Sequence, residues 1–238
     1  STRTLVLGTI SPTASAGATA IGFTVLARTV TGFDAVVPAV TAATPSITVD
    51  QTATGSGQVI FSGGVDMPTG TLTLRTAGAG IAVDAGVVTI RADAVVLEAT
   101  KGTINLEGTY ESWASGMPVT HRRAVLFDAQ SLSATAAGDI RLSTVGDARL
   151  ASLVSTGGDV TLVSGGSVVA LAGGGPNVTA RTLTITAAGS VGTSAATLRT
   201  AVDVVSIAAG LGIDLTESDG SVTLDQAVSN HGDVVVTT

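Results

Sequence analysis

The sequence predicts an all-β protein, a single right-handed parallel β-helix (β-solenoid), and two observations lead to that prediction. A short phrase recurs along the chain, in which a turn residue is followed by an apolar, a polar and an apolar residue. This two-residue alternation, rich in Val, Ile and Thr, is typical of strands. The phrase also returns at intervals of about 20 residues, which is typical of coils stacked in a solenoid.

The recurring phrase is written with Gly-Asp, Gly-Ser or similar openers, which supply the turns between strands. Two of its intervals are equal in length, from Gly138 to Gly158 and from Gly146 to Gly166. One coil of this length cannot bury its apolar face alone, so neighbouring coils must stack on it. The phrase occurs at 70–74, 86–90, 102–106, 138–142, 146–150, 158–162, 181–185, 220–224 and 232–236.

Alternation also assigns the faces of each strand. In Val160-Thr161-Leu162 we expect the valine and leucine to point into the coil and the threonine to point outward. The residues expected at outward positions are Thr73, Thr89, Asn105, Arg141, Arg149, Thr161, Thr184, Ser206, Asp214 and Thr223.

Composition narrows the classes of function. The chain carries a formal net charge of −7, with 45% hydrophobic, 12% charged and 3% aromatic residues. Disorder is excluded by the abundance of apolar residues, and the acidic balance argues against a nucleic-acid partner. The absence of cysteine excludes disulfides and thiolate metal sites. Glycine and proline interrupt the two long uncharged stretches, 4–27 and 160–180, so we expect no membrane span.

Two regions depart from the repeat. Residues 1–61 alternate like strands without a clear period, which predicts an irregular β segment that serves as a cap or docking region. The solenoid is expected over 62–238, with an excursion at 108–134 that holds the only Trp and the only Tyr.

The Gly-Asp/Ser-Val-x-Leu phrases of 138–238, in a Cys-free and Lys-poor background, resemble repeats of filamentous-haemagglutinin-like exoproteins of two-partner secretion systems. Autotransporter-type β-helix adhesins are similar. The resemblance extends over about 62–238. It implies a right-handed parallel β-helix located extracellularly or at the bacterial cell surface, acting as an adhesin or as the shaft that presents one.

The excursion is the main candidate for recognition, because loops on a rigid scaffold often bind partners and Trp, Tyr and Arg dominate binding hot spots. Tyr110 and Trp113 could stack on a sugar or a partner ring, while Glu111, His121 and the pair Arg122-Arg123 supply hydrogen bonds. The alternative is that the excursion folds back over the rod, with Trp113 and Phe127 packed inside.

A calcium site is a second candidate. Asp214, Glu217 and Asp219 place three carboxylates before a turn glycine, and calcium requires several oxygen ligands. The alternative is a solvated acidic turn. We expect no other cofactor.

Catalytic motifs are absent from the sequence. Ser229, His231 and Asp233 lie close together but are read more simply as a turn that opens the last strand. The sequon Asn177-Val-Thr179 is expected in a surface loop.

We therefore expect a non-catalytic structural or adhesive segment whose partner is a glycan or protein on a host or neighbouring cell. The alternative is a filament subunit that stacks end to end with identical subunits, since the strand at 233–238 leaves an unpaired edge. A carbohydrate-active β-helix enzyme is the third reading.

Overall fold

The computed structural model describes residues 3–6, 22–26, 33–37, 40–41, 46–51, 58–61, 63–83, 86–114 and 117–238. No helix occurs among these residues. The first eleven strands are β1 (Arg3–Val6), β2 (Gly22–Leu26), β3 (Phe33–Val37), β4 (Val40–Thr41), β5 (Ser46–Gln51), β6 (Gln58–Phe61), β7 (Val65–Thr76), β8 (Gly80–Val83), β9 (Val87–Ala99), β10 (Thr103–Asn105) and β11 (Glu107–Ala114). The remaining strands are β12 (Met117–Ala136), β13 (Ile140–Thr144), β14 (Ala148–Ser155), β15 (Val160–Ser164), β16 (Val168–Ala170), β17 (Val178–Ala187), β18 (Leu198–Ala209), β19 (Ile213–Glu217), β20 (Thr223–Ser229) and β21 (Val234–Thr237).

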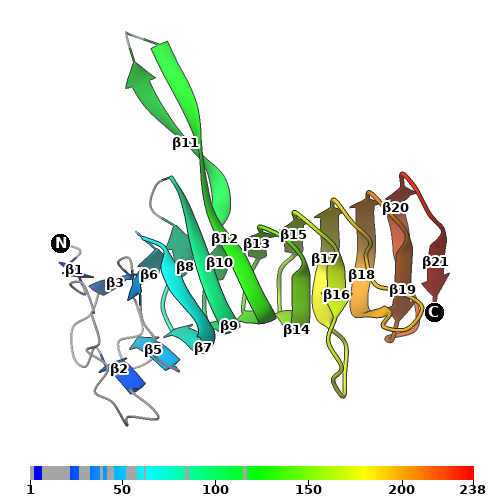
Figure 1. Cartoon of the computed structure of the whole chain (residues 1–238), viewed down its shortest axis with the longest axis horizontal. Coiled ribbons are helices and arrows are strands. Elements are labelled where there is room, and N and C mark those ends of the chain that lie inside the picture. Colours follow the sequence, from blue (N-terminus) through cyan, green and yellow to red (C-terminus); the bar gives the residue numbers. More distant parts are fainter. Residues whose placement is uncertain are drawn as a thin grey trace.

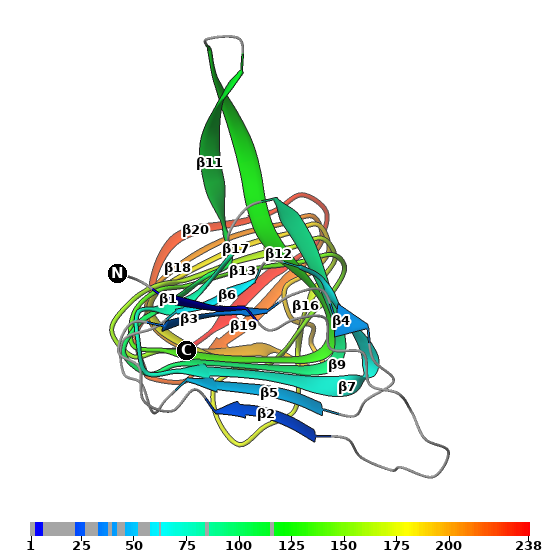
Figure 2. The ribbon, with the colours of Figure 1, turned by 90° about the vertical axis from the view of Figure 1, so that its left-hand side faces the viewer.

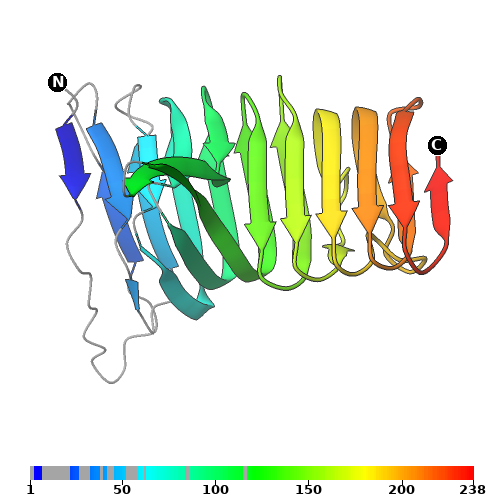
Figure 3. The same ribbon diagram turned by 90° about the horizontal axis from the view of Figure 1, so that it is seen from above.

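The chain coils into a parallel β-solenoid of about eight turns, stacked along one axis as a rod (Figure 1, Figure 3). Each strand lies beside the equivalent strand of the next coil. Ile140 pairs with Val160, Val160 with Leu183, and Leu183 with Val205. Figure 2, which looks along the rod, shows the coils overlaid around a shared interior. The all-β solenoid predicted from the recurring phrase is confirmed.

Long strands bend around the corners of the coil and join two ladders. The first residues of β17, Val178 and Thr179, pair with β14, whereas Leu183 and the residues after it pair with β15. The polar residue at such a bend faces outward: Arg181 of β17 and Asp203 of β18 are both exposed. One strand therefore holds two sides of the coil together.

The predicted faces are confirmed by burial. Val160 and Leu162 are fully buried, and Thr161 between them is half-buried. The core is one continuous cluster of Val, Leu, Ile and Ala along the rod. Phe61 and Phe127 are the aromatic side chains that it contains within the described residues.

The coils are not equally long. Paired residues of successive coils are Ile140 and Val160, then Leu183, then Val205, and then Leu224, so the number of residues in a coil differs from one coil to the next. The corners absorb these differences while the ladders keep their pairing. The predicted period of about 20 residues is thus an average over coils of unequal length.

The N-terminal strands belong to the same stack. β5 pairs in parallel with β7 from Ser46↔Thr71 onward, and β6 pairs with β8 from Gln58↔Gly80 onward. The parallel ladder therefore runs across the boundary expected between residues 61 and 62. The coil from Ser46 to Thr71 is longer than the coils that follow residue 138, which explains why the repeat is not visible there in the sequence.

The excursion is shorter than the expected 108–134. The antiparallel hairpin begins at Glu107, and from Ala124 onward β12 pairs in parallel with β9, from Ala124↔Val87 to Ala136↔Ala99. The second half of the expected excursion is an ordinary rod strand, because apolar residues such as Phe127 return to the core.

Candidate functional site

A hairpin projects from the side of the rod (Figure 1, Figure 2). Its strands pair antiparallel from Glu107↔Ala124 to Ala114↔Met117. We call β11 together with residues 117–123 of β12 the arm. Within the described part of the chain, the register pairs the two strands of the arm only with each other.

The arm is fixed to the rod at its base. Val125 donates its backbone N–H to the carbonyl of Leu106 at 2.8 Å. The carboxylate of Glu107 pairs with Arg122 at 2.7 Å and also accepts a hydrogen bond from the hydroxyl of Ser143 on β13. Ser143 is buried, so these contacts tie the arm to the core of a neighbouring coil.

The residues expected to take part in recognition all lie in the arm. The register places Tyr110 opposite His121, Glu111 opposite Thr120 and Trp113 opposite Pro118. The side chains of Tyr110, Glu111 and Trp113 fall outside the described residues.

The basic half of this set lies nearer the rod. His121 and Arg123 are half-buried, and Arg122 is exposed and paired with Glu107. The fold-back alternative is correct for Phe127, which is fully buried. It is wrong for the strands of the arm, which extend away from the rod instead of covering it.

The three calcium candidates do not converge on one point. Glu217 is buried and accepts hydrogen bonds from the Thr200 hydroxyl at 2.8 Å and from the backbone N–H groups of Ser218 and Asp219. Asp214 is half-buried in the middle of β19, and the Asp219 side chain is exposed. No group of three or more His, Cys, Asp or Glu is arranged to hold a metal among the described residues. Glu217 instead organises the turn that follows β19.

The Gly-Asp phrases form contacts between coils that the sequence did not reveal. Oδ1 of Asp139 accepts a hydrogen bond from the backbone N–H of Asp159 in the next coil, at 3.0 Å. Asp147 does the same for Ser167 at 2.8 Å. Each aspartate thus satisfies a backbone donor one coil further along the chain. The sequence contained one signal for these contacts, because each aspartate precedes its partner by 20 residues, the interval of the repeat.

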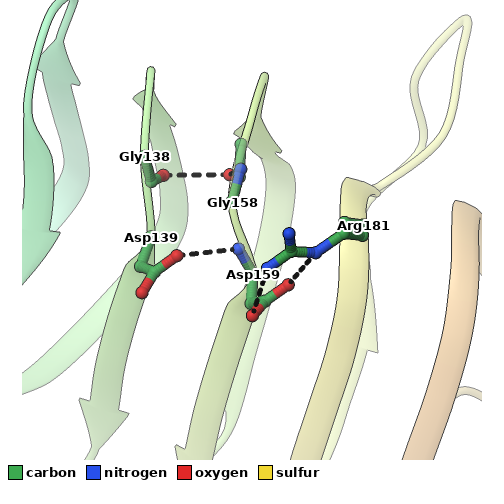
Figure 4. Close-up of polar contacts among 6 residues, drawn as sticks. Gly138, Asp139, Gly158, Asp159 and Arg181 are labelled. Carbon is green, nitrogen blue, oxygen red and sulfur yellow. Dashed lines mark hydrogen bonds and ion pairs between the residues drawn. The ribbon is translucent and has the colours of Figure 1, made fainter.

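Asp159 also holds an ion pair at this corner (Figure 4). Arg181 donates through Nε and Nη2 to the two carboxylate oxygens, both at 3.1 Å. The hydrogen bonds from Arg181 lower the pKa of Asp159 below its ordinary value of 3.8, and burial opposes this shift. The pKa of Arg181 is raised, chiefly by Asp159.

Two grooves in the described surface have charged side chains on their walls. One of about 580 Å³ follows the corner of the rod, with Arg181, Asp203 and Asp219 on its walls. Another of about 300 Å³ lies beside the base of the arm, with Asn105 and Arg123 on its walls. Both present hydrogen-bond donors and acceptors, and neither was expected, because each is assembled from several coils.

The motifs considered for modification and catalysis have structural explanations. Asn177 is buried, and its Nδ2 donates to the carbonyls of Leu150 and Leu171, so the sequon does not lie in an open loop as expected. The hydroxyl of Ser229 bonds to the carbonyls of Leu211 and Gly232, while His231 is exposed.

Searches against protein-family models, curated proteins and solved structures found no significant match. No helix in the described residues has the length and apolar character needed to cross a membrane. The resemblance to haemagglutinin-like repeats therefore depends on the recurring phrase alone. Of what that resemblance implies, the structure shows the β-solenoid fold.

Proposed function

We propose that this chain is a segment of an extracellular bacterial adhesin or surface fibre, in which the rod is a rigid shaft and the arm contacts the partner. One observation supports this most directly. Among the described residues, a continuous parallel ladder carries one antiparallel hairpin that projects from it (Figure 1), and this hairpin contains the only Trp and the only Tyr of the sequence. A rigid scaffold that holds an aromatic loop away from its body is a common arrangement for binding.

The partner we propose is a glycan or a protein on a host or neighbouring cell. Aromatic rings stack on sugars and on partner side chains, and the arginines of the arm add charge-assisted hydrogen bonds. The shaft contributes length and rigidity without chemistry of its own.

The test compares the whole chain with a variant that lacks the arm. Residues 109–122 are replaced by Asn-Gly, because Gly108 and Arg123 are opposite each other at a hydrogen-bonded position, and a two-residue turn connects such a pair. Beads coated with each protein are applied to epithelial monolayers, and the soluble proteins to a glycan array. A second variant, Tyr110→Thr with Trp113→Thr, keeps the hairpin and removes its rings.

We expect the wild type to bind and both variants to lose most of that binding. Binding that persists without the arm would place recognition on the rod, and no binding by the wild type would reject the adhesive role. Release of reducing ends from acidic polysaccharides by the wild type would favour the enzymatic reading instead.

Stacking of identical subunits end to end is a second proposal, and the exposed apolar side chains of β20 and β21 favour it. Leu224 and Val234 are 46% and 43% exposed, whereas their partners in the preceding coil, Val205 and Ile213, are buried. Lysine at Val234 and Val236 should abolish association through this face, as measured by sedimentation, because charge blocks strand addition.

A further inference from the structure

The outer edge of β11 is open within the described part of the chain. β11 pairs with β12 on one side, and the register gives it no partner on the other. A two-stranded hairpin is marginally stable in water by itself. The unpaired N–H and C=O groups of such an edge are a template for another strand.

The register shows which backbone groups face outward. The hydrogen bond from Val125 to Leu106 marks a hydrogen-bonded position at the base of the arm. Because such positions alternate in an antiparallel ladder, Trp113↔Pro118 is a non-hydrogen-bonded pair, which agrees with the missing N–H of Pro118. Thr109, Glu111 and Trp113 therefore direct their backbone N–H and C=O groups away from β12.

The two edges of the arm are not equivalent. On β12 the corresponding outward positions are Pro118, Thr120 and Arg122, and Pro118 removes one donor from that edge. The edge of β11 is uninterrupted. A contact from β11 to β12 would repeat without closing, whereas a contact from β11 to β11 closes as a two-fold dimer.

Charge favours the arm as the place where two copies meet. The chain carries −7 overall. The arm contains two glutamates, Glu107 and Glu111, and two arginines, Arg122 and Arg123, so its formal charge is zero. Two acidic rods repel each other, and the repulsion is least when they approach through neutral segments that project from their bodies.

We propose that β11 pairs antiparallel with β11 of a second copy, so that two arms form one four-stranded sheet. Residues whose backbone groups point away from β12 must lie opposite the same set in the second copy. Glu111 must not lie opposite Glu111 of the second copy, because like charges directly opposite each other are destabilising. The register with Glu111 on the two-fold axis is therefore excluded, and the two nearest registers on either side of it satisfy both conditions. One places Tyr110 on the two-fold axis and Glu111 opposite Thr109, and the other places Ser112 on the axis and Glu111 opposite Trp113.

The first test measures the dimer by analytical ultracentrifugation of the whole chain. Glu111→Pro removes one outward donor from β11 in each copy, and we expect it to raise the dissociation constant by about tenfold or more. Thr120→Pro is the matched control. It changes the residue opposite Glu111, removes an outward donor from the edge already interrupted by Pro118, and should leave the dimer intact.

Two outcomes would overturn the proposal. In one, the wild type stays monomeric at high concentration and high salt. In the other, Glu111→Pro and Thr120→Pro change the dissociation constant equally. Association that survives Glu111→Pro but disappears when Val234 and Val236 are replaced by Lys would identify end-to-end stacking instead. This proposal is independent of the adhesive role. Dimerisation is measured by ultracentrifugation and adhesion by cell and glycan binding, so failure of one does not imply failure of the other.

The second test identifies the register. The chain has no cysteine, so a single introduced thiol reports one contact. A residue on the two-fold axis lies at a non-hydrogen-bonded position, where the two Cα atoms are about 4.5 Å apart and a disulfide is allowed. We expect mild oxidation to cross-link either Tyr110→Cys or Ser112→Cys. Thr186→Cys, at an exposed position on the rod, is the control. If neither Tyr110→Cys nor Ser112→Cys cross-links faster than this control, the pairing is rejected.

Discussion

The rod and the arm are built from the same kind of strand and differ in what surrounds them. In the rod, a strand such as β15 has a ladder on both sides and alternate side chains in the core. In the arm, β11 has one partner strand. β12 passes from one environment to the other without a break, and its Arg122 is exposed whereas Phe127 is fully buried. Two-residue alternation therefore identifies a strand but not whether coils cover it.

The largest effect that sharpens this comparison is expected from Leu162→Asp. Leu162 is fully buried in register between Leu142 and Ile185, so the new carboxylate would have no partner. We expect the free energy of unfolding to fall by about 4 kcal/mol or more, measured by urea titration. Thr161→Asp on the neighbouring outward position should cost less than about 1 kcal/mol. Equal losses would show that the faces are assigned incorrectly.

Limited proteolysis should separate the two regions next. Arg122 and Arg123 lie in the two-stranded arm, whereas Arg141 and Arg199 lie in rod strands with ladders on both sides. Because the arm opens without disrupting the core, we expect trypsin to cut it at least about tenfold faster than those rod sites. Mass spectrometry of the fragments gives the order of cleavage. Earlier cleavage at Arg141 or Arg199 would contradict the view that the rod is the more stable region.

A smaller effect tests the corners of the rod. Gly146 and Gly158 both open Gly-Asp phrases, but only Gly158 lies against the preceding coil. A Cβ at Gly158 would meet the backbone N of Asp139 at 2.6 Å, and one at Gly146 would meet nothing within 4 Å. We expect Gly158→Ala to cost about 2 kcal/mol and Gly146→Ala to change the free energy of unfolding by less than about 1 kcal/mol. Equal thermal shifts in the two variants would mean that the coils are not packed this closely.

The smallest effect is the pH dependence of the pair formed by Asp159 and Arg181. Because Arg181 lowers the pKa of Asp159 in the folded chain, the pair stabilises the fold above the ordinary pKa of 3.8. That contribution is lost as the pH falls through the lowered value. The side chain of Arg181 is 63% exposed and that of Asp159 is 38% exposed, so solvent screening reduces the effect.

The measurement compares urea midpoints of the wild type and Asp159→Asn at neutral pH and at successively lower pH. We expect the difference between them to shrink as the solution becomes acidic. A difference that does not change with pH would show that the charge of Asp159 contributes nothing at this corner.

Sequence alone was sufficient for the class of fold and for the faces of its strands. The phrase at 158–162 predicted both correctly, because turn chemistry and alternation are local properties. The direction of the arm was not predictable, since nothing local distinguishes a hairpin that projects from one that folds back. The contacts of Asp139 and Asn177 were not predictable either, because they depend on which residues of a neighbouring coil lie beside them. For Asn177 the local reading was wrong, because a glycine-rich turn suggested exposure.

The pairing of each coil with its immediate neighbours also determines how the rod responds to mechanical load. Along the column from β13 to β15, β17, β18 and β20, every ladder joins adjacent coils. A force along the axis is therefore carried by successive interfaces in series, and the weakest of them yields first. Extension of the chain in a force experiment should then proceed in steps of about one coil, each releasing roughly 20 residues.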